Sequence, residues 1–238
     1  MEESLSRFGR LIGEDGLDKL AKSTIAVFGI GGVGGHCALS LARAGVGHLV
    51  LVDHDVVAES NINRQEVADY STIGQAKVDV MAKKIRLIRP TTIVEARDTF
   101  FLPGEESSFD FAHYDYVIDC VDNIAAKVAL AKVCTEANIP LISAMGAGNK
   151  LHPEMLKVAD IYETSICPLA KIMRGRLRKE GIPKLKVVYS VEEPIQIAPT
   201  DEILPKGKKT TPGSSPFVPA AMGLLLASSA INDLLGIQ

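Results

Sequence analysis

The sequence has little of several residue types that mark particular classes of protein. Aromatic residues make up 5% of the 238 residues, and tryptophan is absent. The four cysteines contain no C-x-x-C pair, so their local spacing cannot build a tetrahedral thiolate zinc site. Their spacing is not typical of disulfides, and no charged-then-apolar leader opens the chain. We therefore expect a cytoplasmic protein without a structural zinc.

Neither a strong net charge nor a long uninterrupted apolar run is present. The formal net charge of −3 gives no global attraction to nucleic acid. The longest apolar stretch, 217–235, is interrupted by polar residues, which favours a packed C-terminal helix, with a membrane-associated tail as the alternative. Basic residues cluster in two segments, each of which is either a patch for nucleic acid or a solvated surface. The clusters are Lys171, Arg174, Arg176, Arg178, Lys179, Lys184 and Lys186, and then Lys206, Lys208 and Lys209.

A glycine-rich turn between a strand pattern and a helix pattern is the most informative feature present. Gly29, Gly31 and Gly34 match the G-x-G-x-x-G spacing of a nucleotide-binding βαβ unit, and Asp53 ends the next strand pattern. The first glycine permits a tight turn, the second lets phosphate approach the backbone, and the third lets helix and strand pack closely. The free amides of the new helix then face an anion. An ordinary α/β glycine turn is the alternative.

Cations and a second acidic strand end indicate which nucleotide binds. A triphosphate carries more negative charge than a dinucleotide pyrophosphate, and it therefore needs cations and usually Mg²⁺. Arg64 and Lys77 are suitably placed cations, because arginine grips phosphate with a planar fork and lysine supplies a mobile charge. These residues favour ATP. Asp122 follows another buried strand pattern and is a candidate Mg²⁺ ligand, an N-cap of the next helix, or both.

Strand and helix patterns alternate along most of the chain. They predict an α/β fold with a doubly wound, Rossmann-like, mostly parallel sheet and a C-terminal antiparallel extension formed by 155–160 and 186–191 around a basic helix at 169–179. We expect one domain over 1–238, with an N-terminal arm at 1–22, an ATP-binding core at 23–145 and a substrate-closing region at 146–238. The stretch 205–219 is a loop, either closing over substrate or disordered. The expected core elements are 24–28, 34–44, 49–52, 75–88, 93–96, 116–119, 124–137 and 141–143.

The combination of motifs resembles a known family. The chain is similar to the ThiF/MoeB/E1-like adenylating superfamily and, within it, to the tRNA threonylcarbamoyladenosine dehydratases of the TcdA (CsdL) branch. The resemblance runs over nearly the whole chain, and 29–123 is its specific part. It depends on Gly29-x-Gly-Gly-Val-Gly34, Asp53-x-Asp55, Ser60-Asn-Ile-Asn-Arg-Gln65, Gly74-Gln-Ala-Lys77 and Asp119-Cys-Val-Asp-Asn123.

The resemblance implies an activity and a site. The activity is ATP-dependent cyclisation of N6-threonylcarbamoyladenosine in tRNA of the ANN-decoding type, through adenylation of its carboxylate. It also implies a homodimer in which an N-terminal arginine, Arg10 in preference to Arg7, reaches the partner's site. Arg64, Lys77 and Arg10 would be catalytic, and Asp122 would hold Mg²⁺. The implied ATP-binding residues are Gly29, Gly31, Gly32, Gly34, Asp53, Asp55, Asn61, Arg64, Gln65, Lys77 and Asp122.

Two further functions stay open. The first is adenylation of the C-terminus of a ubiquitin-like sulfur carrier, with a sulfur-relay protein as partner. It would require Cys167 to be a reactive thiolate, which a helix N-terminus favours, whereas the alternative is an inert residue at a helix start. The second is a non-catalytic NAD- or nucleotide-binding module, in which Arg64 and Lys77 would be surface charges only.

Overall fold

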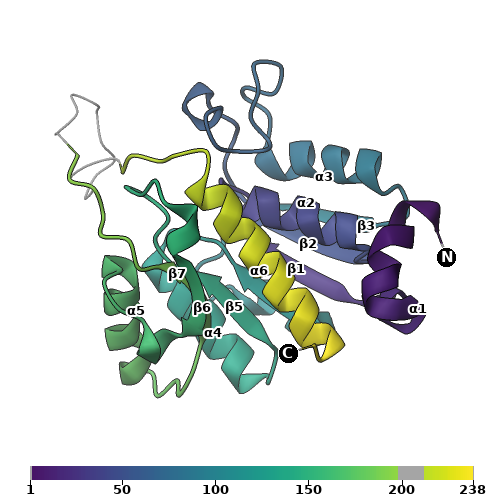
Figure 1. Ribbon diagram of the computed structural model, residues 1–238. Coiled ribbons are helices and arrows are strands. Elements are labelled where there is room, and N and C mark those ends of the chain that lie inside the picture. The colour runs from purple at the N-terminus through teal and green to yellow at the C-terminus, as the bar shows by residue number, and fades with distance from the viewer. Residues whose placement is uncertain (1, 198–211, 238) are drawn as a thin grey trace.

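One seven-stranded sheet forms the centre of the molecule (Figure 1). The computed structural model describes residues 2–197 and 212–237. The strand order is β3-β2-β1-β4-β5-β7-β6, and every neighbouring pair is parallel except β6 and β7, which confirms the predicted mostly parallel sheet with an antiparallel end. The strands are β1 Thr24–Phe28, β2 His48–Asp53, β3 Ile93–Asp98, β4 Tyr116–Asp119, β5 Leu141–Ala144, β6 Leu156–Asp160 and β7 Lys186–Ser190.

Helices cover both faces of this sheet. Alternate residues of the strands point to opposite faces, so Ile25 and Val27 pack with α2, α3 and α6, whereas Ala26 and Phe28 pack with α4. Helix α5 packs beside α4 and next to β7. The arrangement is doubly wound and Rossmann-like. The helices are α1 Ser6–Lys22, α2 Gly34–Ala44, α3 Lys77–Ile88, α4 Ile124–Glu136, α5 Pro168–Lys179 and α6 Val218–Leu235.

Element boundaries differ from the sequence expectation by one or two residues. The helix expected at 75–88 begins at Lys77, because Gly74 has a φ of +83° and Ala76 is extended. The strand expected at 93–96 continues to Asp98, since its pairing with β2 extends that far. Most of the N-terminal arm forms α1, and Gly13, with a φ of +75°, kinks this helix.

The C-terminal helix α6 lies against α2 on the sheet face that α2 covers (Figure 1). By length and composition it is the one helix among residues 2–197 and 212–237 that could cross a membrane. Met222, Leu226 and Ala230 are fully buried in the core beside α2, which fits the expected packed helix. The loop expected at 205–219 and the second basic cluster lie largely outside the described residues, and 212–217 is irregular chain leading into α6.

Candidate nucleotide-binding site

The glycine turn joins β1 to α2 at the carboxyl edge of the sheet. Gly29 has a φ of +89°, and a Cβ there would lie 2.7 Å from the carbonyl oxygen of Cys120. A Cβ on Gly34 would lie 1.8 Å from the carbonyl oxygen of Gly29, so only glycine allows this approach. The first and third glycines therefore have the roles that the motif predicts.

A cavity of about 360 Å³ opens above this turn. Its lining contains every predicted ATP-binding residue except Gly34, which is buried beneath the turn. The structure therefore brings together residues that lie as far apart in sequence as Gly29 and Asp122. The predicted residues in the lining are Gly29, Gly31, Gly32, Asp53, Asp55, Asn61, Arg64, Gln65, Lys77 and Asp122.

Two carboxylates at the end of β2 organise one side of the cavity. Asp53 accepts hydrogen bonds from the backbone N–H of Ile30, at 2.6 Å, and of Asp55, at 2.8 Å. A carboxylate has further lone pairs, so Asp53 can still accept from a ribose hydroxyl. The Lys77 ammonium is buried and donates to Asp55 Oδ2 over 2.7 Å. This ion pair holds the lysine at the cavity wall.

The segment 59–65 supplies another part of the cavity lining. Asn61 closes a tight turn by accepting a hydrogen bond from the backbone N–H of Ala58 over 3.1 Å. The Arg64 guanidinium is partly buried, and this burial lowers its pKa from the ordinary value. The Gln65 side chain is buried, and its Oε1 has no hydrogen-bond partner among the described residues. The wall thus presents one cation and an unsatisfied amide oxygen beside the glycine turn.

An aromatic cluster forms the apolar part of the cavity. Phe28 stands in β1 with its ring centroid 5.2 Å from that of Phe101, and Phe100 packs edge-on to His54 at 4.2 Å. Phe28, Phe100 and Phe101 line the cavity, with Val52 beside them. An apolar wall of this kind suits the flat face of a purine base. Sequence reasoning missed it because 99–115 carries no regular helix or strand pattern.

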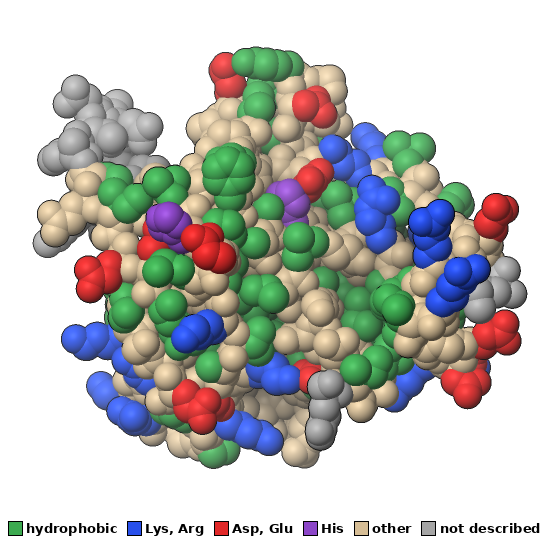
Figure 2. All heavy atoms as spheres, viewed as in Figure 1, with side chains coloured by type: hydrophobic (Ala, Val, Ile, Leu, Met, Phe, Trp, Pro, Cys, Tyr) green, Lys and Arg blue, Asp and Glu red, His purple; other side chains and the backbone are tan. Residues whose placement is uncertain are grey.

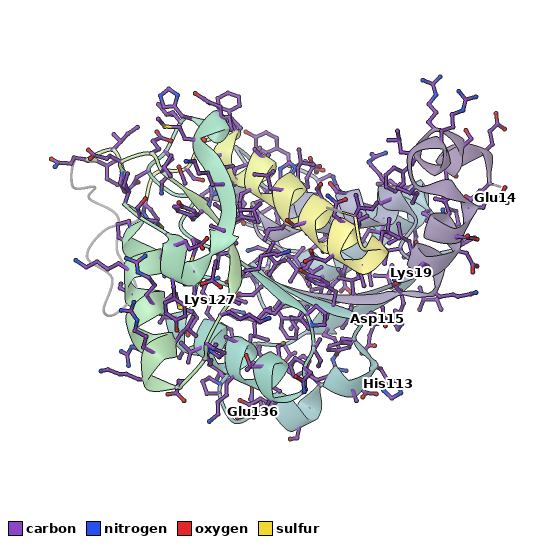
Figure 3. All side chains as sticks on the ribbon, turned by 60° about the horizontal axis from the view of Figure 1, so that its bottom comes forward. Glu14, Lys19, His113, Asp115, Lys127 and Glu136 are labelled. Atoms are coloured by element: carbon purple, nitrogen blue, oxygen red, sulfur yellow. The ribbon has the colours of Figure 1, made fainter. Side chains whose placement is uncertain are left out.

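A buried ion pair joins Asp119, at the end of β4, to Lys127 of α4, which is labelled in Figure 3. Lys127 of α4 points into the interior and donates to Asp119 Oδ2 over 3.0 Å, to Ser143 Oγ over 3.2 Å and to the carbonyl oxygen of Ala144 over 2.7 Å. Asp119 also accepts from the backbone N–H of Val121. Sequence reasoning missed this group, although a lysine inside the apolar helix pattern 124–137 was a usable signal.

One expectation about the loop between β4 and α4 is wrong, because Asp122 is not the N-cap of α4. The N-cap of α4 is Asn123, whose Oδ1 accepts from the backbone N–H of Ala126 over 3.1 Å, so the capping role considered for Asp122 belongs to its neighbour. Asp122 is exposed and lines the cavity. The same lining contains Asp53, His54 and Asp55, which each have one potential ligand atom within 4.8 Å of the others.

Comparison with known proteins identifies the family. A model of the ThiF family matches residues 5–238. The chain belongs to the ThiF family. A relative from Bacillus subtilis named tRNA threonylcarbamoyladenosine dehydratase is 44% identical over 245 residues, covering 99% of this chain and 96% of that protein. The crystal structure of E. coli tRNA N6-threonylcarbamoyladenosine dehydratase, TcdA, in complex with ATP superposes with a TM-score of 0.88 at 33% identity, covering 98% of this chain and 94% of that chain. The sulfur carrier protein ThiS adenylyltransferase of E. coli is 38% identical over 139 residues, 58% of this chain and 55% of that protein.

Two residues singled out in the sequence lie away from the cavity of this ThiF-family chain. Arg10 is exposed on α1 and is not among the residues that line the cavity. The residue just before α1, Leu5, sits beside Gly45 at the opposite end of α2 from the glycine turn. Cys167 is 1% exposed and packs in the apolar cluster beside α5. A thiol buried in this way is inaccessible to a macromolecular partner.

The basic cluster at 171–186 is partly used within the protein. Arg174 donates to the backbone and hydroxyl oxygens of Thr164, and Lys186 pairs with Asp233 at 2.6 Å. The remaining basic residues are exposed, and Figure 2 shows Lys and Arg side chains gathered on the side of the molecule where α5 lies. They are Lys171, Arg176, Arg178, Lys179 and Lys184.

Proposed function

We propose that this protein uses ATP to cyclise N6-threonylcarbamoyladenosine in tRNA by adenylating the carboxylate of its threonyl group. One observation carries the proposal: Arg64 and Lys77 line the same cavity as the glycine turn and Asp53, so triphosphate cations and a ribose acceptor face one space. The family and the names of the relatives that match nearly the whole chain support the same activity. The protein is therefore an enzyme of adenylate chemistry.

The reaction has two steps. A carboxylate oxygen of the substrate attacks the α-phosphorus of ATP, and the bond to the β-phosphate breaks to release pyrophosphate. A group of the same modification then attacks the activated carbonyl carbon, and AMP leaves with the former carboxylate oxygen. Net water is lost from the nucleoside. No covalent enzyme intermediate is needed, so the protein contributes positioning and electrostatic stabilisation.

Arg64 and Lys77 supply that stabilisation in the proposed mechanism. The Lys77 ammonium contacts Asp55 at 2.7 Å at the cavity wall, where it can donate to a phosphate oxygen as well, because an ammonium has three donors. Arg64 lines the same cavity and has a planar guanidinium fork. Together they offset the charge that develops on the departing pyrophosphate.

A magnesium ion fits the carboxylates of this cavity. Asp53, Asp55 and Asp122 all line it, and carboxylate oxygens are the ligands that Mg²⁺ prefers. We propose Asp122 as the residue that would hold the ion, in the cavity that Asp53 and Asp55 also line. When bound, the ion supplies positive charge that the triphosphate requires.

We further propose a homodimer with a shared site, in which Arg10 reaches the cavity of the partner. Arg10 is exposed and lies outside its own chain's cavity, so it can serve a site only across an interface. Mixing inactive Arg10→Ala protein with inactive Arg64→Ala protein should restore activity, because one site of each mixed dimer would be intact. No recovery after subunit exchange, confirmed by mass spectrometry of the mixed dimer, would remove Arg10 from the mechanism.

The exposed basic side around α5 is the proposed tRNA contact. Each phosphate neutralised by Lys or Arg releases counterions, so a local patch suffices despite the net charge of −3. From the resemblance to the dehydratase family we also propose that the substrate is a tRNA of the ANN-decoding type. We further propose that the protein acts in the cytoplasm and that the whole chain forms one domain. A sulfur-relay protein partner stays a prediction.

Mass analysis of tRNA tests the proposal directly. Purified protein, ATP and Mg²⁺ are incubated with tRNA that carries N6-threonylcarbamoyladenosine, and the modified nucleoside is measured after digestion. The expected product is lighter by one water, and Arg64→Ala should abolish its formation. An unchanged nucleoside, together with adenylation of a sulfur-carrier C-terminus, would instead establish the alternative activity.

A further inference from the structure

The guanidinium of Arg64 is already bound to the protein through one of its nitrogens. Nη1 donates to the carbonyl oxygen of Ser60 over 2.9 Å and to Oδ1 of Asn63 over 2.7 Å. These two acceptors use both hydrogens of Nη1, because each guanidinium nitrogen of this type carries two. One end of the fork is therefore fully occupied within the segment 59–65.

The other edge of the fork is left for a ligand. Within the part of the chain that the structure describes, Nε and Nη2 of Arg64 have no hydrogen-bond acceptor. These two nitrogens form one side of the planar group, and their parallel N–H bonds match two oxygens of a phosphate. The stem of Arg64 lies over Gly32, since a Cβ on that glycine would be 3.3 Å from Arg64 Cγ. The stem of Arg64 is thus held next to the glycine turn, and the residue lines the cavity.

A hydrogen bond to Ser214 fixes the orientation of the Asn63 carboxamide. Its Nδ2 donates to the carbonyl oxygen of Ser214 over 2.9 Å, so its Oδ1 must be the atom that faces Arg64. Ser214 lies in the segment 213–215, which forms further hydrogen bonds with the rest of the fold. Gly213 exchanges hydrogen bonds with Asn149, at 2.7 and 2.8 Å, and Ser215 Oγ accepts from the backbone N–H of Val218 at the start of α6.

We propose that Asn63 is a positioning residue for ATP, acting through Arg64. The Asn63 carboxamide donates to Ser214 and accepts from the Arg64 guanidinium, and these two hydrogen bonds fix which edge of Arg64 faces the triphosphate. The proposal rests on the proposed function only in taking ATP as the ligand. Asn63 lies in the segment 59–65, directly before Arg64; it is exposed, and its side chain does not itself line the cavity.

A purely structural role would affect every nucleotide equally, whereas this role affects only those with β- and γ-phosphates. The measurement is therefore the dissociation constant of ATP and of AMP by calorimetry, in wild type, Asn63→Ala, Arg64→Ala and the double variant. Each ratio of ATP to AMP affinity comes from one protein preparation, so a loss of folded protein does not change it. Asn232→Ala, an exposed asparagine of α6, is the matched control.

Asn63→Ala should weaken ATP binding about tenfold, which corresponds to one hydrogen bond to a charged group, and should leave AMP binding within about twofold. In the Arg64→Ala background it should cause no further loss, because the two residues act as one unit. Wild-type ATP affinity in Asn63→Ala, or fully additive losses, would overturn the role. If wild type binds ATP but leaves the tRNA unchanged, the proposed function fails while this coupling still stands.

Discussion

Removing the buried ammonium of Lys127 should destabilise the protein more than removing any exposed lysine. The Lys127 side chain is 1% exposed, and so is Asp119, with which it pairs at 3.0 Å. Methionine has a similar length, so Lys127→Met removes the charge with little change in packing volume. It leaves the Asp119 carboxylate buried without a cation, for which we expect a loss of about 3–5 kcal/mol in the free energy of unfolding.

Urea denaturation of Lys127→Met beside Lys132→Met measures this effect. Lys132 lies on the same helix, its side chain is 54% exposed, and its pairing with Glu180 is loose at 3.9 Å, so its replacement should cost about 0–1 kcal/mol. Adding Asp119→Asn to Lys127→Met should recover part of the loss, because the orphaned charge is removed. If the two lysine variants lose the same stability, the buried pair does not contribute to the stability of the fold as argued.

The remaining predictions concern the glycine turn and the thiols. Gly34→Ala should abolish ATP binding in calorimetry, because its Cβ would lie 1.8 Å from the carbonyl oxygen of Gly29. Gly175→Ala, where the Cβ has open space around it, is the control and should bind ATP normally. Retained binding in Gly34→Ala would refute the close approach. Burial raises the pKa of Cys37, Cys120 and Cys134, the last to about 12, so these thiols should react with alkylating reagents at pH 8 far more slowly in the folded than in the urea-unfolded protein. The raised pKa values also make stability fall with pH, because the unfolded thiols ionise near pH 9.0 while the folded ones stay neutral. Above that pH the free energy of unfolding should drop by about 1.4 kcal/mol per pH unit per thiol. A urea midpoint that stays constant from pH 8 to pH 11 would contradict the burial.

The sheet and the phosphate-binding turn could be predicted from the sequence because both depend on local patterns. Apolar runs of strand length between helical runs indicate parallel pairing, and the glycine spacing at 29–34 requires a particular backbone. The antiparallel end was also predicted, from 155–160 and 186–191. Its place in the strand order, with β7 between β5 and β6, depends on long-range packing that periodicity does not encode.

The distant partners of a side chain could not be predicted from the sequence, even where the side chain itself stood out. Lys127 matters because Asp119 and Ser143 meet it from two neighbouring strands, which only the assembled sheet brings together. The sequence also does not show whether Asp122 or Asn123 caps α4, since the two residues are adjacent and both residue types cap helices well. The aromatic wall around Phe101 comes from irregular chain, where no period reveals which rings turn inward.

The position at which ATP is cleaved tests the central claim most directly. ATP labelled at the α-phosphorus is incubated with the protein and tRNA carrying N6-threonylcarbamoyladenosine, and the labelled nucleotide products are separated. We expect labelled AMP and unlabelled pyrophosphate, with one AMP formed for each nucleoside cyclised and none in Arg64→Ala or Lys77→Ala. Labelled ADP, or cyclisation that proceeds without AMP, would contradict the account of this cavity as an adenylating site.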